Sequence, residues 1–178
     1  MKGLLIKGGK VINGDGGLPQ GMLDLLVQAG KIVRIAKSID PAEHPEAALL
    51  DAGGQWVMPG FVDMHVHLRE PGQEYKEDIA SGTLAAVHGG YTGVVCMPNT
   101  QPVIDDPSVL SSVLQRAAER AHCRVYPAAA ITKGLKGEEL TEIGLFQRAG
   151  AVAFTDDGKP VSDPKRMLLA MQYSIALD

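Results

Sequence analysis

The chain has 178 residues, of which 45% are hydrophobic and 21% are charged, and its formal net charge at pH 7 is −4. This composition is typical of a globular domain with a buried core, and no apolar stretch reaches the ~20 residues that a transmembrane helix needs. The small negative charge gives no electrostatic reason to expect nucleic acid or an anionic membrane as a partner.

The two cysteines and the first residues indicate a cytoplasmic protein. Cys96 and Cys123 show neither metal-knuckle nor disulfide-framework spacing, and both lie in or beside apolar, strand-like segments. Buried free thiols in a reducing compartment are the simplest interpretation of this pattern. The apolar run near the amino terminus is too short for a signal peptide.

The first part of the chain is predicted to form short strands separated by glycine turns. The predicted strands are Leu4–Ile6, Lys10–Ile12, Met22–Val27, Lys31–Ala36, Ala48–Ala52 and Gln55–Met58. We expect the last two to form a pair around the turn Gly53-Gly54. Periodicity establishes a small β unit here and nothing more specific.

From Pro59 onward, apolar strands alternate with amphipathic helices. The predicted strands are Phe61–His67, Tyr91–Met97, Arg124–Ile131 and Ala151–Thr155, and the predicted helices span about Tyr75–His88, Pro107–Ala121 and Glu138–Ala149, with a fourth starting after the cap Asp163-Pro164. Four βα units in a row predict an α/β fold with a parallel sheet covered by helices, either an open doubly wound sheet or a barrel. The first turn, Leu68 to Gly72, is not GxGxxG, so we favour the first half of a TIM-type (β/α)8 barrel.

The strongest local motif is Asp63-Met64-His65-Val66-His67. Because residues two apart share a face of a strand, His65 and His67 are predicted to project together, with Asp63 one layer deeper. Two imidazoles at this spacing can hold one divalent ion, although a lone His-x-His pair is more often two hydrogen-bonded polar residues. Because this pair stands where an apolar strand gives way to a charged loop, as active-site residues of barrel enzymes do, we favour metal binding.

Polar residues also follow the other three predicted strands, at Asn99, Thr132-Lys133 and Asp156-Asp157. The carboxyl ends of parallel strands share one rim, so a carboxylate after the fourth strand can reach a metal held by the first. By itself the aspartate pair is more often an ordinary turn, and Asn99 is a turn residue by default. Arg69 is by default a solvated loop side chain, but beside His67 its guanidinium can grip a substrate carboxylate through two parallel hydrogen bonds.

Longer segments of the chain resemble one family. The segment from Pro59 through Asp63-Met64-His65-Val66-His67 to Gly72 resembles the metal-binding signature of the amidohydrolase superfamily in its dihydroorotase form. Four later segments resemble bacterial class I dihydroorotases in order and spacing: Tyr75-Lys76-Glu77-Asp78, Cys96-Met97-Pro98-Asn99-Thr100, Ile131-Thr132-Lys133-Gly134 and Ala153-Phe154-Thr155-Asp156-Asp157-Gly158. The resemblance implies that residues 1–57 are the N-terminal part of a β-sandwich, and that residues 58–178 are the N-terminal half of a metal-dependent (β/α)8 barrel.

The resemblance also implies a set of site residues. His65 and His67 would be zinc ligands, and Asp157 would be the ligand from the fourth strand, bridging where a second Zn²⁺ binds. Arg69 and Asn99 would hold the carboxylate of the substrate. Hydantoinases and some dihydroorotases carry a carboxylated lysine at the fourth strand, so Asp157 favours the bacterial class I type.

The activity implied is that of a zinc-dependent cyclic amidohydrolase, a dihydroorotase. Such enzymes convert dihydroorotate and water reversibly to N-carbamoyl-L-aspartate in pyrimidine biosynthesis. Family members continue for roughly another 250 residues, on the scale of a complete barrel. That part would supply histidine ligands from strands five and six and an aspartate general base after strand eight. We therefore expect no catalytic base within these residues and no activity from this chain alone.

Two other functions and one assembly question stay open at this point. A non-catalytic dihydroorotase-like partner of aspartate transcarbamoylase would have no need to keep His65, His67 and Asp157. A hydantoinase or allantoinase is disfavoured by Asp157 in place of a lysine. An open half-barrel exposes the edges of its first and fourth strands, so we expect either a homodimer or a segment of a longer chain.

Overall fold

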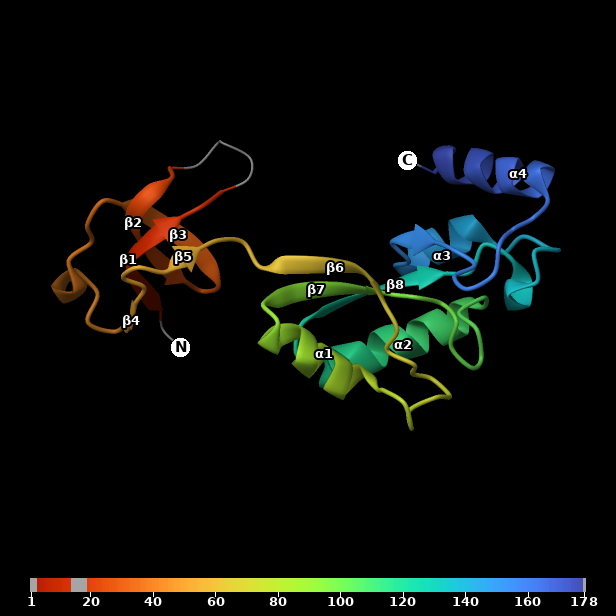
Figure 1. Ribbon diagram of the computed structural model, residues 1–178, viewed down its shortest axis with the longest axis horizontal. Helices are drawn as coiled ribbons and strands as arrows, with labels where there is room; N and C mark the ends of the chain where they lie inside the picture. The colour runs from red at the N-terminus through yellow and green to blue at the C-terminus, as the bar shows by residue number, and fades with distance from the viewer. Residues whose placement is uncertain (1–2, 14–18, 178) are drawn as a thin grey trace. The chain divides into compact units, whose positions relative to one another are not determined.

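A computed structural model describes residues 3–13 and 19–177 of the chain. The chain divides into two compact units, Met1–Pro59 and Gly60–Asp178. The first contains strands β1 to β5, and the second contains strands β6 to β9 with helices α1 to α4 (Figure 1).

The first unit is a single five-stranded sheet with the order β3-β2-β1-β4, in which β5 also pairs with β1. Its strands are β1 (Leu4–Val11), β2 (Gly21–Gln28), β3 (Lys31–Ala36), β4 (Ala48–Asp51) and β5 (Trp56–Val57), and a short 3-10 helix, η1 (Pro41–Glu43), follows β3. The strands predicted at Leu4–Ile6 and Lys10–Ile12 are one strand, β1, interrupted by an irregularity between Ile6 and Gly9. Gly8 takes a φ of +68° there, in the left-handed region that glycine enters without penalty.

The predicted pairing of the last two strands with each other is wrong. Strands β4 and β5 both run parallel to β1, one after the other. Between them the chain stays beside β1, because Ala52 N donates to Lys7 O at 2.8 Å and Lys10 N donates to Gln55 O at 2.8 Å. The Gly53-Gly54 turn therefore continues along the same strand instead of reversing the chain into a hairpin.

A buried carboxylate fixes the irregular point of β1. Asp24 on β2 accepts hydrogen bonds from the Lys7 ammonium, from Gly8 N at 2.8 Å and from Ile39 N at 2.8 Å. Burial alone would raise the pKa of Asp24, but these hydrogen bonds outweigh it, so the pKa lies below its ordinary value. Asp24 thus joins the irregular point of β1 to the connection after β3, where Leu5, Leu26 and Ile39 form a small core.

The second unit is a four-stranded sheet with the order β6-β7-β8-β9, in which every neighbouring pair is parallel. The elements are β6 (Phe61–Val66), α1 (Ile79–His88), β7 (Tyr91–Cys96), α2 (Pro107–Arg120), β8 (Arg124–Ala129), a 3-10 turn η2 (Lys133–Leu135), α3 (Ile143–Ala149), β9 (Ala153–Phe154) and α4 (Pro164–Ile175). Helices α1 and α2 lie side by side along one face of the sheet (Figure 1). The predicted alternation of strands and helices is confirmed, and within the described residues β6 and β9 are the edges of this sheet.

Two helices are shorter than predicted because polar residues before them form other contacts. Helix α1 begins at Ile79 because Asp78 and Ser81 form a capping box. The Asp78 carboxylate accepts from Ser81 N, and the Ser81 hydroxyl oxygen accepts from Asp78 N. Helix α3 begins only at Ile143, because the preceding segment forms η2 and a bridge between Thr132 and Leu140. The cap at Asp163 and the start of α4 at Pro164 are as predicted.

The core of the second unit lies between the sheet and its helices. Its buried members include Ile79, Val94, Leu110 and Phe146. Cys96 belongs to this core, and burial raises the pKa of its thiol to about 12, as expected for an inert core cysteine. Cys123 is half-buried, and both thiols are free. In the described part of the chain, no helix has the length and apolar character needed to cross a membrane.

Glu70 anchors the loop that follows β6. Its side chain is 1% exposed, accepts from Ile79 N at 3.0 Å, and pairs with the guanidinium groups of Arg116 and Arg120 on α2. Burial alone would raise the pKa of Glu70, but the bond from Ile79 N and the two arginines outweigh it, so the pKa lies below its ordinary value. One carboxylate therefore ties the loop to the first turn of α1 and to α2.

The substitution Glu70→Gln should lower the free energy of unfolding at neutral pH by about 1–3 kcal/mol, because it removes the charge that three buried contacts require. The contribution of Glu70 is complete above its unfolded-state pKa of about 4.3 and is lost as the pH falls through the lower folded-state value. Urea unfolding followed by circular dichroism should therefore show a smaller loss of stability on acidification in Glu70→Gln than in the unchanged chain.

Glu74→Gln is the matched control, because Glu74 also pairs with Arg116, at 3.5 Å, but has an exposed side chain. Its effect should stay below about 1 kcal/mol. Equal effects of the two substitutions would contradict the anchoring role of Glu70.

Candidate metal centre

An irregularity in β6 decides which of its side chains face the site. The register with β7 shifts between Asp63 and Val66, so the two-residue alternation is broken inside the histidine motif. Asp63 and Val66 line a hollow against α1, whereas His65 lines a hollow on the opposite face of the sheet. The prediction that Asp63 lies beneath His65 on the same face is therefore wrong. Asp63 instead accepts from His65 N at 3.0 Å and braces the irregular turn of the strand.

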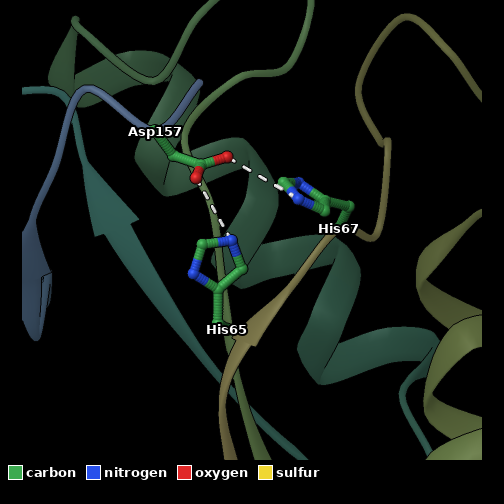
Figure 2. Close-up of side chains that lie close together, drawn as sticks. All are labelled: His65, His67 and Asp157. Atoms are coloured by element: carbon green, nitrogen blue, oxygen red, sulfur yellow. Dashed lines mark ion pairs between the residues drawn. The ribbon is translucent and has the colours of Figure 1, made fainter. Parts of the chain in front are cut away.

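Three predicted ligands converge at the carboxyl ends of the outer strands β6 and β9 (Figure 2). His65 Nε2 lies 3.2 Å from Asp157 Oδ1, and His67 Nε2 lies 3.6 Å from Asp157 Oδ2. The two rings are nearly perpendicular, with centroids 5.2 Å apart. Exposed side-chain fractions are 57% for His65, 31% for His67 and 17% for Asp157, so the cluster is open on the His65 side.

The spacing of these atoms fits one divalent ion. One ligand atom from each of His65, His67 and Asp157 lies within 4.8 Å of the others. Zinc with bonds of about 2.0–2.1 Å in a tetrahedral shell holds its ligand atoms about 3.3 Å apart. The nitrogen-to-oxygen distances, 3.2 Å to Oδ1 and 3.6 Å to Oδ2, lie on either side of that value, so each carboxylate oxygen of Asp157 lies at about ligand spacing from one histidine. Two imidazoles and a carboxylate are also a donor set that zinc accepts.

Asn99 lies between two of the three ligands. This residue follows β7, and its side-chain amide reaches His67 Nδ1 at 3.1 Å through Oδ1 and Asp157 Oδ2 at 2.9 Å through Nδ2. The structure therefore brings Asn99 to the cluster, as the shared rim of the strands predicts. Its contacts with the ligands themselves were not predicted, since the sequence pattern gave no reason to pair it with a histidine.

Arg69 stands two residues beyond His67, in a loop with unusual backbone geometry. Its φ is +61°, a left-handed conformation that a residue with a side chain rarely adopts. Its backbone carbonyl accepts from Gln73 N at 3.0 Å, and its guanidinium forms no ion pair within the described part of the chain. The side chain is half-buried and is not committed to any carboxylate there.

The neighbour of Asp157 has a different task. Asp156 is 5% exposed and accepts from Ile131 N at 2.8 Å, from Thr132 N at 2.9 Å and from the Thr132 hydroxyl. It thereby joins the chain after β9 to the end of β8 and fixes the backbone that carries Asp157. The polar pair after the third strand does not join the cluster, because Thr132 serves this clamp and Lys133 pairs with Glu139.

Two further hollows lie beside the sheet of this unit, in addition to the one that Asp63 and Val66 line. One of about 500 Å³ contains His65 and is otherwise lined mainly by apolar side chains, including Val62, Met64, Val95 and Tyr126. A larger one of about 800 Å³ lies at the opposite, amino-terminal ends of the strands, where Tyr91 and Arg124 begin β7 and β8. The larger hollow is therefore remote from the metal-binding candidates, and only the smaller one adjoins them.

The known proteins that this chain resembles belong to one family. The family model described as Dihydro-orotase-like matches residues 54–178. The chain is 50% identical over 174 residues to the dihydroorotase of Sulfurihydrogenibium sp. (strain YO3AOP1), and 50% identical over 157 residues to that of Syntrophobacter fumaroxidans. The chain belongs to the dihydroorotase-like family.

The family relationship covers nearly all of this chain but less than half of its relatives. The two alignments cover 98% and 87% of the chain, and 40% and 36% of the respective relatives. Among solved structures, the L-hydantoinase of Arthrobacter aurescens superposes with a TM-score of 0.82 at 24% identity, covering 99% of this chain and 39% of that one. At this identity the match shows a shared fold, in which the four parallel strands correspond to part of a barrel.

The two neighbouring aspartates of this family member should respond differently to alanine substitution. Asp156→Ala leaves two backbone N–H groups and one hydroxyl unsatisfied in a buried place, and should lower the free energy of unfolding by about 2 kcal/mol or more. Asp157→Ala removes a half-buried carboxylate with a single side-chain amide donor, and should change the free energy of unfolding by less than about 1 kcal/mol. Denaturant titration of both variants in metal-free buffer checks this, and a reversed order would contradict the assignment of the clamp.

Proposed function

We propose that this chain is the metal-binding part of a zinc-dependent cyclic amidohydrolase of the dihydroorotase type. Such an enzyme interconverts dihydroorotate plus water and N-carbamoyl-L-aspartate, a reaction of pyrimidine biosynthesis. The observation that carries the proposal is the convergence of His65, His67 and Asp157 at the ends of two parallel strands. The identity of about 50% to dihydroorotases supports this substrate over other cyclic amides.

In this proposal, His65 and His67 hold zinc through their Nε2 atoms, and Asp157 holds it through its carboxylate. The chemistry that a bound zinc ion supplies is polarisation of a carbonyl oxygen and activation of a water molecule at neutral pH. Both histidines come from one strand, and Asp157 comes from the opposite edge of the sheet. The parallel sheet therefore sets the distance between them and keeps the three groups in place before any ion arrives.

The substrate would be held through its carboxylate. Arg69 supplies a guanidinium with no partner among the carboxylates of the described residues, and such a fork binds a carboxylate through two parallel hydrogen bonds. Asn99 uses one Nδ2 hydrogen on Asp157, which leaves its second for the same substrate carboxylate. Both residues would orient the ring beside the metal ligands without taking part in bond making.

Other activities are less well supported. The likeness to hydantoinases rests on solved structures that are 20–24% identical to this chain, and such a likeness supports the fold and not the substrate. A non-catalytic partner of aspartate transcarbamoylase would need no cluster of three ligand atoms within 4.8 Å. Because the chain spans about 40% of its relatives, we further propose that it does not turn over dihydroorotate by itself, the remaining ligands and the general base being supplied by residues equivalent to the rest of those relatives.

The proposed ligands can be tested by zinc binding to the purified chain. His65→Ala, His67→Ala and Asp157→Ala should each weaken zinc binding by roughly 100-fold or more. Loss of a residue that only contacts a ligand typically costs about 10- to 100-fold, and loss of a ligand itself should cost more. Competition against a chromogenic chelator measures this affinity. His88→Ala is the control, because His88 is exposed at the end of α1 and should leave the affinity unchanged. Equal affinity in all four variants would exclude this site.

The proposed activity can be tested in a chimera. Replacing the aligned 174 residues of the Sulfurihydrogenibium dihydroorotase with this chain should give a protein that hydrolyses dihydroorotate with zinc. His67→Ala in the chimera should reduce turnover by at least about 1,000-fold, since a zinc ligand is lost. A folded chimera that binds zinc but leaves dihydroorotate intact would contradict the proposed substrate, and turnover by the 178-residue chain alone would contradict its proposed inactivity.

A further inference from the structure

The side-chain amide of Asn99 contacts two of the proposed metal ligands at once. Its Nδ2 lies 2.9 Å from Asp157 Oδ2, and its Oδ1 lies 3.1 Å from His67 Nδ1. Asn99 stands after β7, the strand next to β6, whereas Asp157 follows β9 at the far edge of the sheet. One amide that follows an inner strand therefore spans the gap between ligands that come from the ends of the two outer strands.

The chemistry of the three groups fixes the direction of both hydrogen bonds. An ionised carboxylate only accepts hydrogen bonds, so the amide group that faces Asp157 must be the NH₂. The amide oxygen then faces His67 Nδ1, and because that oxygen only accepts, Nδ1 must carry a proton. A neutral His67 is thereby held as the Nδ1–H tautomer, with the lone pair on Nε2.

In this tautomer, the lone pair on Nε2, on the other side of the ring, requires a cation as its partner. Nε2 of His67 lies 3.6 Å from Asp157 Oδ2, so two electron-pair donors face each other unless a cation stands between them. A proton on Nε2 or a metal ion meets that requirement. Metal-binding histidines commonly have their second nitrogen fixed by a hydrogen bond of this kind, which selects the tautomer and orients the ring.

We propose that Asn99 is a positioning residue that presets both His67 and Asp157 for one divalent cation. This inference rests on the proposed function, because it takes His67 and Asp157 as ligands. Through Oδ1 the amide selects the tautomer whose Nε2 can bind a metal, and through Nδ2 it turns one carboxylate oxygen of Asp157 toward the same point. Asn99 thus acts on the metal through its ligands, in addition to any contact with substrate.

The proposal can be tested in the metal-free chain by the tautomer of His67. Long-range ¹⁵N–¹H correlation spectra, recorded at an alkaline pH, report which ring nitrogen of a neutral imidazole carries the proton. In the unchanged chain His67 should be the Nδ1–H tautomer. In Asn99→Leu and Asn99→Ala, this tautomer should give way to the Nε2–H form or to a mixture.

The second measurement is zinc affinity by chelator competition on the same proteins. Asn99→Leu and Asn99→Ala should bind zinc about 10- to 100-fold more weakly than the unchanged chain. Gln115→Leu is the matched control, because it removes an exposed side-chain amide on α2 that contacts only Glu119 in the described structure. It should change neither the tautomer nor the affinity.

The outcomes separate this proposal from the proposed metal site. An Nε2–H tautomer of His67 in the unchanged chain would overturn the role of Asn99 without any variant having to fold. Full zinc affinity in folded Asn99→Leu or Asn99→Ala, with affinity lost in His67→Ala, would overturn it while leaving the metal site intact. Equally weak zinc binding by the unchanged chain and by His67→Ala would overturn the metal site itself, and the role of Asn99 with it.

Discussion

Strands β6, β7, β8 and β9 run parallel in that order, so the carboxyl ends of all four strands lie on the same rim of the sheet. Every group of the candidate site follows from this constraint. His65 and His67 come from the end of β6, Asn99 follows β7 and Asp157 follows β9. These residues are as much as 92 positions apart along the chain, yet the sheet brings them to within contact distance. An antiparallel pairing of the same strands would place neighbouring strand ends at opposite edges.

Buried carboxylates hold irregular segments of both units in place. Glu70 holds the loop after β6 against α1 and α2, and Asp156 holds the end of β9 to the end of β8. In the other unit, Asp24 ties the irregular point of β1 to the connection after β3. Each of these acids accepts at least one backbone N–H from a distant part of the chain, because buried peptide groups outside regular structure need a partner. Asp157, by contrast, is partly accessible and faces His65 and His67.

Asp156 and Asp157 illustrate how neighbouring identical residues acquire different functions. Both follow the same short strand, and their side chains point in different directions, one into the protein and one toward the two histidines. Asp156 is satisfied by three donors from the protein, whereas Asp157 receives one amide and faces two imidazole nitrogens. We therefore expect loss of Asp156 to affect folding and loss of Asp157 to affect metal binding. The two effects arise from partners and not from residue type.

The sequence by itself determined the alternation of strands and helices, the half-barrel, and the residues that gather at its rim. Apolar runs and the cap at Asp163 are local signals, and the structure retains them. Resemblance to the family distinguished Asp157 from Asp156, which no pattern of polarity could do. The pairing of β4 and β5 with β1, the register shift that turns Asp63 away from His65, and the amide of Asn99 between two ligands were decided only by the tertiary structure. These features depend on which distant backbone and side-chain groups meet, and the spacing of residues along a chain does not contain that information.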